Sequence, residues 1–219
     1  MTTPHYADNY QQALTYHRRL PDRIRTYLHS RGLPDAVICR FRLGWNGVRI
    51  TIPITNRHRQ VVLFRLAKDP ADTSDSPNIM SSENDVLELY GWERLVFKKE
   101  RIVICQGEFE RLVLEARGIP AISSTGDGSV FRLEWADGLR DTERVYVCFR
   151  NDKQSQDNAA GVAALVPHSR IVLLPNEVGL GGGIEDYLVR LGKTTDEFRG
   201  LLDMAVGPEE APTTPDGHD

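Results

Sequence analysis

The sequence predicts an α+β first part followed by an α/β part built on a parallel sheet, with the boundary near residue 97. Charge divides the chain in the same way. Residues 1–68 hold 12 Lys and Arg against 3 Asp and Glu, whereas the remaining residues hold 15 basic and 28 acidic side chains. The apolar pattern also changes, from a stretch with period two to short apolar runs that alternate with helical segments. Two parts of opposite charge indicate two different tasks.

Composition sets the broad class. The chain has 219 residues, of which 40% are hydrophobic and 26% charged, and it is long enough to bury a core. No apolar run is long enough to span a bilayer, and residues 1–9 lack the pattern of a secretory signal. The three cysteines have no metal-like spacing, which favours reduced core residues. We therefore expect a cytoplasmic protein without membrane contact.

The first part combines helices with a hairpin. The expected elements are a helix over 10–31, a short helix over 34–41, strands over 48–54 and 60–66, and a polar loop over 68–84. Pro21 and Asp22 suit a first helical turn, and Pro53 indicates an edge strand or a bulge. We expect this part to span residues 1–97.

The second part alternates strands and helices. The expected elements are strands over 102–105, 119–122, 145–149 and 171–174, and helices over 108–117 and 159–165. Strands this short, separated by helices, are typical of a parallel sheet covered on both faces. The stretch after Met204 has three prolines and no apolar periodicity. We expect the second domain over 98–204 and a disordered acidic tail over 205–219.

Polar clusters follow three of the expected strands. They are residues 106–110, residues 150–152 and, a few residues past the last strand, residues 181–186. Ligands collect at the carboxyl ends of parallel strands, and carboxylates gathered there suit Mg²⁺. The alternative is that these acids cap helices by accepting hydrogen bonds from free backbone amides. The sequence alone leaves both interpretations, Mg²⁺ binding and helix capping, open.

The order of these motifs resembles the catalytic core of DnaG-type primases, a basic subdomain followed by a Toprim domain with a Rossmann-like sheet. The matching stretches are residues 102–110 with Gly118-Ile119-Pro120, residues 145–152 with 158–161, and residues 173–188. Upstream, residues 27–33, 41–45, 52–54, 62–65, 77–81 and 89–91 are also similar. The resemblance covers about residues 10–203. It implies nucleic-acid binding and Mg²⁺-dependent phosphoryl transfer.

Three residues depart from the family pattern. Gln106 stands where the family has a catalytic glutamate, Arg150 where it has the first Asp of Asp-x-Asp, and Gly183 where it has an acid in the third motif. The acids that remain as candidate metal ligands are Glu110, Asp152, Glu185 and Asp186. A glutamine is no general base near neutral pH, and a guanidinium repels Mg²⁺. We expect Mg²⁺ to be held weakly or not at all.

The basic half carries the expected nucleic-acid contacts. Arg57, Arg59, Arg65 and Lys68 cluster in sequence on the predicted hairpin and the loop that leaves it. Arginine-rich segments of this kind bind the phosphates of DNA or RNA. We expect these four residues to line a groove for a single strand.

Three functions remain open at this point. The first is a primase-derived Toprim protein that binds nucleic acid with weak or lost catalysis, in DNA replication or in a mobile-element complex. The second is an active primase or Toprim nuclease with an unusual metal site. The third is a protein-interaction module. A metal titration with and without DNA discriminates between the first two.

Overall fold

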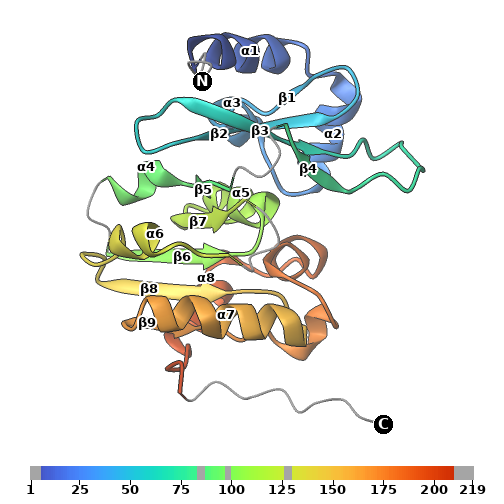
Figure 1. Cartoon of the computed structure of the whole chain (residues 1–219). Coiled ribbons are helices and arrows are strands. Elements are labelled where there is room, and N and C mark those ends of the chain that lie inside the picture. The colour runs from blue at the N-terminus through green and yellow to red at the C-terminus, as the bar shows by residue number, and fades with distance from the viewer. Residues whose placement is uncertain (1–5, 83–86, 97–99, 126–129, 210–219) are drawn as a thin grey trace. The chain divides into compact units, whose positions relative to one another are not determined.

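The computed structural model describes residues 6–82, 87–96, 100–125 and 130–209. The chain forms two compact units, residues 1–93 and residues 94–219. The first unit joins helices to an antiparallel sheet, and the second carries a parallel sheet, so the expected fold class is confirmed. Figure 1 shows the order of the elements.

The first unit begins with three helices. They are α1 (Tyr6–Arg18), α2 (Asp22–Ser30) and α3 (Asp35–Arg40). The expectation of one helix over 10–31 was wrong, because the helix is interrupted at Leu20 and Pro21. Pro21 has extended backbone angles and serves as the N-cap of α2. Proline has no backbone N–H, and it disfavours helical geometry in the residue before it, so the two helices are separate.

The antiparallel sheet of the first unit has the order β1-β2-β3-β4, with β1 (Gly44–Trp45), β2 (Ile50–Thr55), β3 (Val61–Ala67) and β4 (Ile79–Ser81). The predicted hairpin is β2 with β3. Strand β4 lies inside the segment that we expected to be a loop. Its three residues are too few to show a period of two. Further along the chain are β5 (Leu89–Tyr90) and α4 (Trp92–Leu95).

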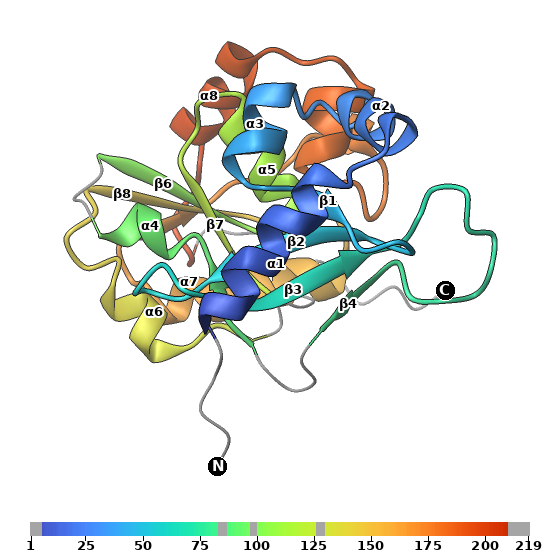
Figure 2. The ribbon, with the colours of Figure 1, turned by 90° about the horizontal axis from the view of Figure 1, so that it is seen from above.

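Strand β2 is buried on both faces rather than half-buried as expected. Helix α1 lies across β3 and β2, as Figure 2 shows, and Ala13 packs against Phe64 on that face. Thr51 and Pro53 are in register with Leu66 and Phe64, so they lie on the face that α1 covers. Pro53 sits beyond the two β2 residues that pair with β1, and the register shifts one residue later. The missing N–H of Pro53 therefore costs no sheet hydrogen bond on that side.

In the second unit four parallel strands follow the order β7-β6-β8-β9. They are β6 (Arg101–Cys105), β7 (Ala121–Ser124), β8 (Arg144–Cys148) and β9 (Ser169–Ile171). The helices are α5 (Glu108–Ala116), α6 (Leu133–Asp137), α7 (Lys153–Leu165) and α8 (Thr195–Asp203), with the short helices η1 (Asn176–Val178) and η2 (Asp186–Arg190). The crossovers through α5 and α7 run in opposite directions, so right-handed connections place these helices on opposite faces.

The end of the described chain belongs to the fold. Ala205 is buried, and Val206 forms an antiparallel bridge with Ile171 of β9 through two backbone hydrogen bonds of 2.8 and 3.0 Å. We expected these two residues to begin the disordered tail, and for them that expectation was wrong. Residues 207–209 of the expected tail are also described, and residues 210–219 lie outside the described residues.

Candidate functional site at the carboxyl edge of the parallel sheet

Strands β6 and β8 end side by side. Cys105 and Cys148, the last residue of each strand, are in register, so Gln106 and Arg150 follow at the same edge of the sheet. The Gln106 Oε1 accepts a hydrogen bond of 3.3 Å from the backbone N–H of Arg150. Gln106 therefore joins the two strand ends, and its neutral amide supplies no general base.

Glu110, in the first turn of α5, is a buried acid of this edge. The residue is 3% exposed, and its Oε2 has no hydrogen-bond partner among the described residues. Burial raises the pKa of Glu110 to about 8; Arg150 opposes this rise, while the charge of Glu185 adds to it. The carboxyl group is therefore mostly protonated at neutral pH.

The Arg150 side chain lies beside Glu110. Its Nε is 3.6 Å from Glu110 Oε1, and its side chain is 50% exposed. The backbone of Arg150 is held on both sides, because its carbonyl also accepts a hydrogen bond of 2.7 Å from Gln156 Nε2. A cation therefore stands next to the position where the resemblance implies a metal ligand.

Gly183 leaves no room for the missing third-motif acid. A Cβ atom built on Gly183 would lie 1.9 Å from Glu110 Oε1 and 3.4 Å from Arg150 Cγ. A side chain at position 183 would therefore require the end of the Glu110 side chain to move. Arg150 and Gly183, two of the residues that depart from the family pattern, thus both lie beside the Glu110 carboxylate. The sequence did not reveal this proximity.

Asp186 is engaged by the protein itself. Its Oδ2 accepts a 3.0 Å hydrogen bond from the Gly183 N–H, and its Oδ1 accepts one of 2.8 Å from Arg190 Nε. Burial alone would raise the pKa of Asp186, but these two donors outweigh it and hold the pKa below its ordinary value. Glu185, the preceding residue, is partly buried.

Asp152 is the N-cap of α7. Its Oδ1 accepts a hydrogen bond from the Ser155 N–H and its Oδ2 one from the Ser155 hydroxyl, both of 2.9 Å. This is the helix-capping alternative that the sequence left open. Ser155 and Arg190, which orient Asp152 and Asp186, were missed. An acid three residues before a serine, and an acid four residues before an arginine, are the signals that could have found them.

The donor set does not fit Mg²⁺. Within the described part of the chain, no group of three or more His, Cys, Asp or Glu residues is placed to hold a metal ion. The oxygens of Asp152 and Asp186 are already taken by donors from the protein, and Glu110 is buried beside a guanidinium. Mg²⁺ is usually held in near-octahedral geometry by one or two carboxylates together with waters and substrate phosphates, so it needs carboxylates that are accessible and not already engaged.

The four predicted nucleic-acid contacts do not form one cluster. Arg57 and Arg59 are exposed in the turn that joins β2 to β3. Arg65 is 8% exposed within β3, between Ile52 and Ser81 on the neighbouring strands. Lys68 follows the other end of β3, where its Nζ donates to the Ser74 carbonyl. Strand β3 separates them: its seven residues, at about 3.3 Å each, span about 23 Å, so the hairpin turn and Lys68 are far apart.

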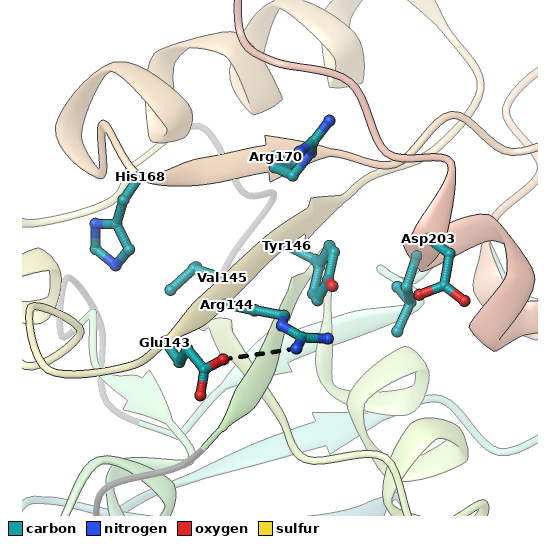
Figure 3. A pocket seen from close by; sticks show the side chains of 8 residues that line it. Glu143, Arg144, Val145, Tyr146, His168, Arg170 and Asp203 are labelled. Carbon is teal, nitrogen blue, oxygen red and sulfur yellow. Dashed lines mark ion pairs between the residues drawn. The ribbon is translucent and has the colours of Figure 1, made fainter.

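A cavity of about 410 Å³ lies at the opposite, amino-terminal edge of the parallel sheet. Figure 3 shows Arg144 and Arg170 among its lining residues. Arg144 is 3.5 Å from Glu143 Oε1, and Arg170 Nε donates to the Ala205 carbonyl. These two cations already have partners in the protein.

Solved structures provide the comparison. The chain matches the Escherichia coli primase catalytic core with a TM-score of 0.76 and 20% identity, over 97% of this chain and 87% of that one. A DnaG primase catalytic domain bound to single-stranded DNA matches with a TM-score of 0.75 and 21% identity, over 97% and 87%. The chain has the fold of a DnaG-type primase catalytic core.

The chain covers only part of a longer relative with this primase-core fold. In the Aquifex aeolicus primase, comprising zinc-binding and RNA polymerase domains, it matches 60% of that chain with 91% of its own, at a TM-score of 0.74 and 20% identity. No protein-family model matches the sequence, and no curated protein matches it. Among the described residues, no helix is both long enough and apolar enough to cross a membrane.

Proposed function

We propose that this protein is a primase-related Toprim protein that binds nucleic acid and does not synthesise primers by itself. The fold supports the first half of the proposal. One structure with this fold is a primase catalytic domain bound to single-stranded DNA, and another is the RNA polymerase domain of the Mycobacterium tuberculosis primase with a DNA oligomer that has a 6-nucleotide overhang. The basic first part of this chain is suited to the same kind of ligand.

The second half of the proposal, the absence of primer synthesis, rests on the packing of Glu110 against Gly183 and Arg150. Phosphoryl transfer on two metal ions needs a dense set of carboxylates to hold them. Here one carboxylate fills the space above Gly183, and a guanidinium lies beside it. Asp152 and Asp186 are engaged by Ser155, Arg190 and backbone amides. We propose that catalysis is lost for this reason.

The test measures template-dependent ribonucleotide incorporation with Mg²⁺ or Mn²⁺, beside the binding of a labelled single-stranded oligonucleotide. We expect binding at low salt and no incorporation, with an active primase core as the positive control. Incorporation that Glu110→Gln abolishes would favour an active enzyme with an unusual metal site. Absence of binding at low salt would contradict the nucleic-acid role.

A further inference from the structure

The guanidinium of Arg150 has its Nε directed toward Glu110, while the edge formed by its two Nη groups is available for a ligand. Its Nε lies 3.6 Å from Glu110 Oε1, and its two Nη groups make no hydrogen bond with any described residue. The side chain is 50% exposed, so these groups are accessible from solvent. An arginine with a free planar edge matches two oxygens of a phosphate group.

The position of Arg150 is fixed before any ligand arrives. Gln106 accepts from its N–H and Gln156 donates to its carbonyl. The next residue, Asn151, exchanges backbone hydrogen bonds of 2.9 Å with Gly182 and Gly181. Because the backbone is already ordered at this point, less conformational entropy is lost when the guanidinium binds a ligand.

A divalent ion in a phosphoryl-transfer site joins protein carboxylates to phosphate oxygens. A guanidinium can join the same two groups, with Nε toward the carboxylate and the Nη edge toward the phosphate. We propose that Arg150 takes over this joining role, so that the edge binds a phosphate group without a divalent cation. This inference rests on the proposed function, and the phosphate belongs either to a nucleoside triphosphate or to the backbone of a single strand.

The acids nearby restrict this site to the outer face of Arg150. Asp186 is neutralised by Arg190 at 2.8 Å, and Glu110 lies on the inner side of the guanidinium. Glu185 is another acid of this edge, close enough for its charge to raise the pKa of Glu110, and an acid disfavours a phosphate beside it. A phosphate is therefore expected on the solvent-exposed side of the Arg150 guanidinium, away from Glu110.

The test uses the full chain and two probes, a fluorescent adenosine triphosphate analogue and a labelled single-stranded oligonucleotide. Each is titrated with Mg²⁺ and with a chelator. Arg150→Gln removes the charge, and Arg150→Lys keeps the charge without the planar edge. Arg199→Gln is the matched control, since Arg199 lies in α8 and its side chain is 49% exposed, close to the 50% of Arg150. Circular dichroism and the melting temperature show whether each variant is folded.

We expect the wild type to bind with the same Kd, within twofold, with and without the divalent ion. Arg150→Gln should raise that Kd about tenfold or more, Arg150→Lys should raise it severalfold, and Arg199→Gln should change it less than threefold. If Arg150→Gln loses binding of the nucleotide analogue, the phosphate belongs to a nucleoside triphosphate. If Arg150→Gln loses only the binding of the oligonucleotide, the phosphate belongs to the backbone of the nucleic-acid strand.

Two results overturn the inference. One is binding by the wild type that the chelator abolishes, and the other is an equal loss in Arg150→Gln and Arg199→Gln. If the wild type binds the oligonucleotide and Arg150→Gln binds it equally well, this inference fails and the proposed function stands. If the wild type binds no oligonucleotide, the proposed function fails, and the nucleotide titration alone decides whether Arg150 holds a phosphate.

Discussion

The carboxylate of Glu110 occupies the space into which a side chain at Gly183 would extend. A Cβ on Gly183 would lie 1.9 Å from Glu110 Oε1. Since the backbone at Gly183 is not in the left-handed region, this contact alone makes alanine unfavourable. We expect Gly183→Ala to lower the free energy of unfolding by about 1–3 kcal/mol, measured by urea denaturation.

Gly161 of α7 provides the control, because a Cβ there would meet nothing within 4 Å. Gly161→Ala should raise the free energy of unfolding by about 0.5–1 kcal/mol through its helix propensity. Adding Glu110→Ala to Gly183→Ala removes the clash, so the double variant should be more stable than the sum of the two single changes predicts. Strict additivity would show that the two residues do not compete for this space.

The pKa of Glu110 predicts how stability depends on pH. Its folded value of about 8 lies above the ordinary value of 4.5, so the folded protein binds one more proton than the unfolded chain between these limits. The stabilisation is complete below about pH 4.5 and is lost as the pH rises toward 8, by up to about 1.4 kcal/mol per pH unit.

Glu110→Gln should remove this dependence, because the amide keeps the shape and does not titrate. The measurement is the free energy of unfolding from pH 5 to pH 9 for the wild type, Glu110→Gln and Glu134→Gln. Glu134 is an exposed acid of α6. Wild-type and Glu110→Gln curves that run parallel over this range would show that Glu110 is ionised throughout.

The capping role of Asp152 predicts a difference between two substitutions. Asp152→Ala loses both hydrogen bonds to Ser155 and should cost about 1 kcal/mol of stability. Asparagine is also a good N-cap, so Asp152→Asn should cost less than half as much. Thermal unfolding of both variants measures this difference, and equal losses would point to a role for the carboxylate charge.

The architecture of the second unit was predictable because its signals are local. Short apolar runs ending at Cys105 and Cys148, each followed by a polar cluster, placed the candidate site at one edge of the sheet. The capping box of α8, formed by Thr194 and Glu197, could also be recognised in the sequence, but we did not predict this helix.

The chemistry of the edge depends on contacts that no local pattern carries. Glu110 and Gly183 are far apart in sequence, and only the folded chain shows that one fills the space of the other. For the same reason, the charge pattern grouped Arg65 with Arg57, although one is buried in β3 and the other is exposed in a turn. Sequence spacing along a strand does not show which side chains face solvent.

The exposed hairpin turn gives the last prediction. Arg57 and Arg59 are the two predicted nucleic-acid contacts in this turn, and both are exposed. Arg59 has a φ of 62°, a conformation that asparagine tolerates well, so Arg57→Gln with Arg59→Asn should preserve the fold. Each lost phosphate contact should weaken oligonucleotide binding and reduce the slope of log K against log salt by about 0.7 for a single strand. Fluorescence anisotropy from low to moderate salt measures both effects, with Arg140→Gln, an exposed change in the second unit, as the control. An unchanged affinity and slope in the double variant would place the nucleic acid elsewhere on the protein.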